Sequence, residues 1–86
     1  MYYVYVLKSQ KDERLYFGFT SDLKRRMIEH NSGMEKSTKY GVPWTLVYFE
    51  AFLSGRDASK REKQLKKYKS AYGFLKQRIR ESVNET

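Results

Sequence analysis

The chain has 86 residues, with 18 Lys and Arg against 10 Asp and Glu, and its net charge of +8 indicates one small basic domain over residues 1–86. It contains no cysteine and one histidine, which excludes a disulfide framework and a thiolate zinc site. Its apolar runs are far shorter than the roughly 20 residues of a membrane span, so we expect a cytoplasmic protein with no membrane partner.

Most of the positive charge lies near the C-terminus. Residues 56–86 carry ten Lys and Arg against four Asp and Glu, whereas residues 1–55 carry eight against six. Such a balance favours a polyanionic partner, and nucleic acid is the commonest one. A solvated helical face, or a face that docks on an acidic membrane or protein surface, would have the same composition.

Two strands joined by a polar turn are expected at the N-terminus. Tyr2–Leu7 and Leu15–Thr20 are rich in aromatic and β-branched residues. Both faces of the first strand are apolar, so both should be covered. In such a hairpin Tyr5 and Tyr16 lie on neighbouring strands and can approach one another. Gly18 interrupts the second strand, which indicates either a bulge or a close approach to the backbone.

A helix should follow from about Leu23 to Asn31, because Thr20–Asp22 offers N-cap residues and Gly33 ends the pattern. Arg26 and His30 are four residues apart and therefore share one face of this helix. We expect that face to look toward Tyr16.

Residues 31–44 form a long polar connection, and the strand Thr45–Phe52 follows it. Lys36 and Lys39 in the connection fit either a nucleic-acid contact or an ordinary solvated loop. The strand is the most apolar part of the chain, so we expect it at the centre of the sheet.

The C-terminal third has helical spacing from Asp57 to Tyr68, with Ala58 and Leu65 on one stripe. Glu62 lies among five cations of this helix, either as a surface ion-pair partner or as an inward-pointing ligand of a divalent cation. A last helix is expected from about Ser70, packed through Phe74, Leu75 and Ile79, and the tail 81–86 should fray.

The order and spacing of these residues resemble the GIY-YIG endonuclease domain, in particular its small stand-alone bacterial members. The same domain forms the N-terminal nuclease of the bacterial excision-repair incision subunit. The resemblance runs from Tyr2 to about Leu75 and rests on Tyr3-Val4-Tyr5, Tyr16-Phe17-Gly18, Arg26, His30 and the segment from Ala58 to Arg61-Glu62-Lys63.

The resemblance implies an α+β fold of order β-β-α-β-α-α, in which helices flank a three-stranded antiparallel sheet. It also implies cleavage of DNA that requires one Mg²⁺ or Mn²⁺ ion and leaves a 5′-phosphate and a 3′-hydroxyl, with repair or recombination as the setting. Carried over by position, the catalytic residues are Tyr5, Tyr16, Arg26 and His30, the metal ligand is Glu62, and Gly18 ends the second motif.

The chemistry of these side chains agrees with such roles. Magnesium keeps most of its waters, so Glu62 and a substrate phosphate suffice as further ligands. Arg26 would stabilise the charge on the phosphate oxygens and would favour the phenolate of a neighbouring tyrosine. Either Tyr5 or Tyr16 would then serve as the general base, with His30 sharing the proton.

The residues expected to contact nucleic acid are Lys24, Arg25, Lys36, Lys39, Lys60, Arg61, Lys63, Lys66 and Lys67. The chain also departs from the family pattern, because Phe19 stands where some members carry a lysine. No asparagine falls on the position that some members use near the site. The alternative is therefore a catalytically weak module that binds nucleic acid through its basic C-terminal helices.

Overall fold

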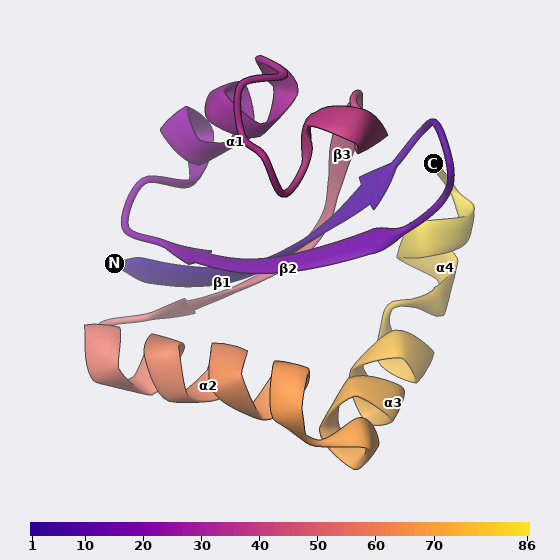
Figure 1. The fold of residues 1–86 in the computed structure, drawn as a ribbon. Helices are drawn as coiled ribbons and strands as arrows, with labels where there is room; N and C mark the ends of the chain where they lie inside the picture. The colour runs from indigo at the N-terminus through magenta and orange to yellow at the C-terminus, as the bar shows by residue number, and fades with distance from the viewer.

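A three-stranded antiparallel sheet separates two layers of helices in the computed structural model, which describes residues 1–86 (Figure 1). The fold is therefore α+β, as the resemblance implies. The elements in chain order are β1 (Tyr2–Ser9), β2 (Leu15–Thr20), α1 (Leu23–Asn31), a 3₁₀ turn (Lys39–Gly41), β3 (Trp44–Phe52), α2 (Gly55–Lys67), α3 (Lys69–Arg78) and α4 (Arg80–Asn84).

The central strand is β1, since the strand order is β2-β1-β3. It pairs antiparallel with both neighbours, and Val4–Leu7 are at most 1% exposed. The expectation that the third strand lies at the centre is wrong. An apolar strand can lie at the edge of a sheet when other elements cover most of its two faces. The edge position of β3 is visible in Phe49, which is half exposed.

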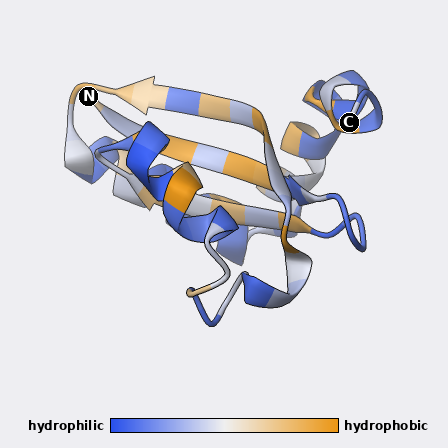
Figure 2. Cartoon of the chain, turned by 90° about the horizontal axis from the view of Figure 1, so that it is seen from above, coloured by the Kyte–Doolittle hydropathy of each residue, from blue (hydrophilic) through white to orange (hydrophobic).

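Both faces of β1 are buried, as its sequence predicts. Val4 and Val6 pack with Ala58 and Leu65 of α2 on one face, below the sheet in Figure 1. On the other face a smaller cluster contains Tyr5, Leu7 and Trp44, packed against Leu23 and Met27 of α1. Figure 2, seen from the side of α1, shows apolar residues in the strands and a mostly polar outer surface on α1.

Local capping explains where two helices begin. The Asp22 carboxylate accepts a hydrogen bond from the Arg25 backbone at 3.1 Å, and Ser54 accepts one from Arg56. No helix is long and apolar enough to cross a membrane.

The C-terminal helices differ from expectation at three points. Phe74 does not pack but is 73% exposed, because Leu75 of α3 and Ile79 just after it face the core, with Ala71 and Tyr72 packed beside them. Tyr68 ends α2 and is also exposed. The tail is not frayed in the structure: it forms α4, and Lys8 Nζ donates to the Val83 carbonyl at 2.9 Å.

The connection between α1 and β3 is exposed over most of its length but is anchored by two buried residues. Thr38 and Gly41 are buried, and Ser9 donates a hydrogen bond to the Gly41 carbonyl. The indole of Trp44 donates to the Thr38 carbonyl at 2.8 Å. This loop therefore holds its side chains in place over one face of the sheet.

Candidate active site

The two tyrosines of the motifs lie on the same face of the hairpin. Tyr5 is opposite Gly18, and Leu7 is opposite Tyr16, so both tyrosine side chains point toward α1. A Cβ atom at Gly18 would collide with the Tyr5 ring. Gly18 is thus a place of close approach to the backbone and not a bulge, and the group that approaches it is the ring of Tyr5 from the neighbouring strand.

Helix α1 brings His30 to both tyrosines. The His30 ring is fully buried, and its centroid lies 5.8 Å from that of Tyr5 and 5.0 Å from that of Tyr16. Its Nε2 is 2.8 Å from the Tyr5 hydroxyl. Burial raises the pKa of Tyr5, and the guanidinium of Arg26, one turn earlier on the same face, opposes that effect. The spacing of Arg26 and His30 therefore places both beside Tyr5.

A buried hydroxyl that the sequence did not indicate completes this chain of hydrogen bonds. Thr38 Oγ1 is 3.0 Å from His30 Nδ1, so the imidazole is held between Tyr5 and Thr38. When His30 is neutral, Tyr5, His30 and Thr38 carry three donor protons in total, but only two hydrogen bonds join them. One of these protons therefore takes no part in the two hydrogen bonds. When Tyr5 loses its proton, Thr38 donates to His30, His30 donates to the phenolate, and every donor is satisfied.

Two carboxylates hold the guanidinium of Arg26. Its Nη1 donates to Glu29 at 2.9 Å and to Glu35 at 2.6 Å, and these bonds raise the pKa of Arg26 above its usual value. Glu35 belongs to the loop that also carries Thr38. Neither residue has a signal in the sequence, because their contacts with α1 depend on how the loop folds back.

Burial controls the protonation of the site. Burial raises the pKa of Tyr5 to about 12, and this effect exceeds the opposing effect of Arg26. Arg26 does favour the phenolate, as expected, but its effect is smaller than that of burial, so Tyr5 is protonated at pH 7 in the free protein. Burial also lowers the pKa of His30, so the imidazole is neutral at pH 7.

Glu62 approaches the site from α2, on the other side of the sheet. Its Oε2 lies 3.1 Å from Lys66 Nζ, and that ammonium is 5.9 Å from the centroid of the Tyr16 ring. Glu62 also contributes to the raised pKa of Tyr5. The ion pair with Lys66 is the surface role that the sequence allowed, and Oε1 makes no hydrogen bond within the protein.

The structure contains no group of three His, Asp or Glu residues that could hold a metal ion. Magnesium is often bound by one or two carboxylates while the remaining ligands are waters and phosphate oxygens. A single half-shielded carboxylate with one free oxygen fits that donor set. Glu62 is therefore the residue that would hold a divalent cation.

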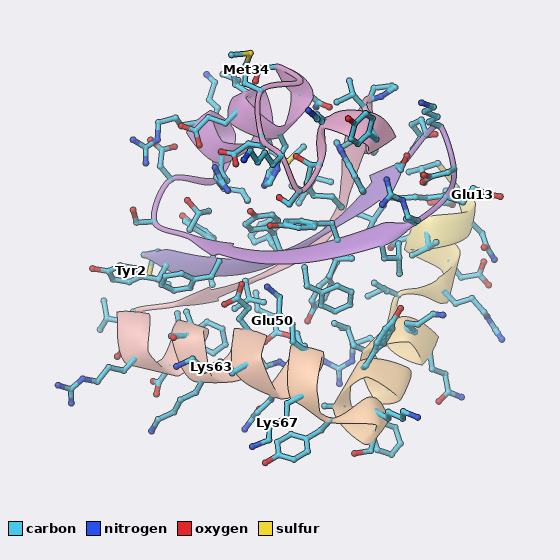
Figure 3. The ribbon with its side chains drawn as sticks, viewed as in Figure 1. Tyr2, Glu13, Met34, Glu50, Lys63 and Lys67 are labelled. Atoms are coloured by element: carbon cyan, nitrogen blue, oxygen red, sulfur yellow. The ribbon has the colours of Figure 1, made fainter.

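The cations predicted to contact nucleic acid fall into two groups. Arg61 does not belong to the exposed group. It lies on the β3 side of α2 and donates three hydrogen bonds of 2.9 to 3.0 Å to Glu50, whose carboxylate lies between the sheet and α2 (Figure 3). Arg25 is 4.0 Å from Asp22, and Lys66 is paired with Glu62. The exposed ones without a carboxylate partner are Lys24, Lys36, Lys39, Lys60, Lys63 and Lys67.

Asn31 has a structural contact. Its amide donates to the Trp44 carbonyl at 3.0 Å and accepts from the Trp44 backbone N–H at 2.6 Å. These two bonds join the end of α1 to the start of β3. Phe19, at the lysine position of some family members, stacks on Tyr2 at the end of the sheet, with ring centroids 6.2 Å apart.

Comparison with known proteins gives one consistent result. The model of the GIY-YIG catalytic domain matches residues 1–80. The UPF0213 protein CPE1444 of Clostridium perfringens is 48% identical over 68 residues, which cover 78% of this chain and 72% of that protein. The UPF0213 protein SpyM50708 of Streptococcus pyogenes is 44% identical over 69 residues, which cover 79% and 74%.

A solved structure shares the fold over the whole chain. The solution NMR structure of the UPF0213 protein BH0048 from Bacillus halodurans aligns with a TM-score of 0.59 and 31% identity. The alignment covers 100% of this chain and 95% of that one.

Proposed function

Because the chain belongs to the GIY-YIG catalytic domain family, we propose that it is a metal-dependent endonuclease that hydrolyses DNA phosphodiester bonds. Its products would be a 5′-phosphate and a 3′-hydroxyl, and its setting DNA repair or recombination. The observation that supports this proposal is that four side chains from three separate elements lie together near Glu62. They are Tyr5, Tyr16, Arg26 and His30.

Tyr5 is the general base in this proposal. Its hydroxyl is bonded to His30, which in turn is bonded to Thr38, whereas the Tyr16 hydroxyl makes no hydrogen bond within the protein. The three-residue chain is fully satisfied only when Tyr5 is deprotonated, so it stabilises the phenolate against the cost of burial. The phenolate accepts a proton from the attacking water as the water oxygen bonds to phosphorus. The bond between phosphorus and the 3′ oxygen breaks, and the leaving 3′ oxygen takes a proton from solvent water.

In this proposal Arg26 binds the non-bridging oxygens of the phosphate, which take the place of one of its present carboxylate partners. Its Nη1 is shared by Glu29 and Glu35, and a phosphate that replaces Glu35 gains a donor already aimed into the site. Glu62 would hold a Mg²⁺ or Mn²⁺ ion, which supplies positive charge to the scissile phosphate and the leaving oxygen. Lys66, its partner in the free protein, is then released toward the phosphate chain.

The test is nicking of supercoiled plasmid at low salt, with Mg²⁺ or Mn²⁺ against EDTA. Glu62→Ala and Tyr16→Phe should each reduce the metal-dependent rate, Glu62→Ala by about 100-fold or more, because each removes a group beside the scissile phosphate. Glu85→Ala, which removes an exposed carboxylate of the tail, is the matched control and should cut like the parent protein. Full activity of Glu62→Ala would refute the assignment of the metal ligand.

A second function is favoured by the carboxylates on Arg26. A guanidinium that is neutralised by Glu29 and Glu35 is a poor phosphate ligand, and it suits a module that binds DNA through exposed lysines without cutting it. In that case the parent protein and both variants would shift the plasmid equally, and none would nick it with either metal.

A further inference from the structure

A cavity of about 290 Å³ opens at the edge of β2, next to Tyr16. Its floor is apolar, because Phe17 of β2 and Leu65 of α2 are almost fully buried. Its lining residues are Leu15, Tyr16, Phe17, Leu65, Lys66 and Tyr72. We call it the β2–α3 cavity, since β2 and α3 contribute its aromatic walls. It adjoins the candidate active site through Tyr16.

Each aromatic wall of this cavity carries an ammonium group. Lys66 Nζ lies 5.9 Å from the centroid of Tyr16, and Lys76 Nζ lies 5.3 Å from the centroid of Tyr72. Tyr72 itself packs on Phe17 with ring centroids 5.2 Å apart, which holds its ring beside the opening. The cavity is thus apolar and bordered by aromatic rings, with positive charge at its rim.

This chemistry fits a nucleotide better than a purely apolar group. Aromatic rings in such a cavity can stack on the face of a base, and ammonium groups at the rim can contact the adjoining phosphates. The volume lies at the lower end of the range for small-molecule sites, so it suits one base rather than several. A chain of net charge +8 also favours an anionic ligand.

A base inside duplex DNA is stacked and paired, and it cannot enter a cavity at the edge of a sheet without leaving the helix. An unpaired base has no such cost. Because Tyr16 borders both the cavity and the candidate active site, a base held in the cavity would lie next to the phosphate at the site.

We infer that the β2–α3 cavity binds the base of an unpaired nucleotide beside the scissile phosphate, and that the enzyme therefore prefers DNA with unpaired nucleotides next to the cut. The inference rests on the proposed nuclease function and adds the class of its substrate. It assigns Tyr72 as a residue that determines specificity by stacking on that base.

Binding in EDTA tests the inference apart from catalysis. The probes are a short duplex with a single-stranded extension and the same DNA with an abasic nucleotide at the first unpaired position. Fluorescence anisotropy should show at least about 5-fold tighter binding of the DNA that carries the base, since stacking on one aromatic side chain is worth roughly 1–3 kcal/mol. Equal affinity of the parent protein for both probes would overturn the inference, whatever the variants do.

Tyr72→Leu keeps an apolar side chain at this position and removes the aromatic ring, so it should abolish the preference for the base. Phe74→Leu is the matched control, because Phe74 is an exposed aromatic residue of the same helix that does not line the cavity, and it should retain the preference. Retention of the preference by folded Tyr72→Leu would also overturn the inference. A preserved binding preference without any cleavage would refute only the nuclease function, and cleavage without the preference would refute only the cavity's role.

Discussion

Tyr5 holds its proton more tightly in the folded chain than a tyrosine does in water, since burial raises its pKa to about 12. A residue with such a pKa is a useful base only if its surroundings stabilise the phenolate during the reaction. Thr38 is the residue best placed to do this at a distance, because its hydroxyl can donate to Nδ1 of His30 while Nε2 donates to the Tyr5 oxygen. Thr38 is therefore a positioning residue and not a catalytic one.

Thr38→Val should lower the nicking rate at pH 7 by about fivefold, because the loss of one hydrogen bond of roughly 1 kcal/mol disfavours the phenolate of Tyr5. The diagnostic measurement is the pH–rate profile, whose rising limb should move to higher pH by about 0.7 units. Thr38→Ser retains the hydroxyl and should restore the profile. A Thr38→Val enzyme that loses rate without any displacement of the profile would indicate a purely structural role.

At the scale of one element, α2 divides its side chains among four sides of the helix. Ala58 and Leu65 face the sheet, Arg61 faces Glu50 of β3, and Lys63 and Lys67 are exposed on the outer face. Lys67 extends away from the sheet in Figure 3. Glu62 lies on the remaining side, toward Tyr16, so one helix carries the proposed metal ligand and a row of cations.

The outer lysines of α2 should contribute to DNA binding through charge alone. If each lysine neutralises one phosphate, the double variant Lys63→Ala/Lys67→Ala should bind DNA with a weaker salt dependence. The slope of the logarithm of the association constant against log salt concentration should become less negative by about 1.8. A charge-matched control is Lys11→Ala/Arg80→Ala, which removes two exposed cations from the hairpin turn and from α4. Equal slopes for the two double variants would show that Lys63 and Lys67 contact phosphates no more than other exposed cations do.

At the scale of the whole molecule, protonation of the buried His30 should lower the free energy of unfolding. Burial, and secondarily the charge of Arg26, lower the pKa of His30 in the folded state below its ordinary value of 6.5. The unfolded chain therefore binds more protons than the folded chain just below pH 6.5, and stability must decrease as the pH falls through that window. Carboxylates such as Glu29, whose folded pKa is also lowered, lose their stabilising contribution only near and below pH 4.5.

Urea denaturation at pH 7.5 and pH 5.5 isolates the contribution of His30. The free energy of unfolding of the parent protein should be lower at pH 5.5. His30→Gln has no group that titrates in this window, and its stability should be nearly the same at both values, even if it is lower throughout. A parent protein with no loss of stability between these pH values would contradict a neutral, buried His30.

The sequence by itself determined the elements and the motif residues. Strand composition, the Asp22 and Ser54 caps and the spacing of Arg26 and His30 are local properties, because they depend on neighbours within one turn or one strand. The same spacing carried the resemblance to the GIY-YIG family, and the family match over residues 1–80 confirms it.

Only the tertiary structure decided the strand order, the exposure of Phe74 and the partners of the site. Thr38 contacts His30 and Glu35 contacts Arg26 because the loop after α1 folds back, and Glu50 contacts Arg61 because β3 packs on α2. No periodic pattern in the sequence predicts these contacts. The raised pKa of Tyr5 has the same origin, since burial depends on everything that covers the residue. The β2–α3 cavity likewise exists only where β2, α2 and α3 pack together.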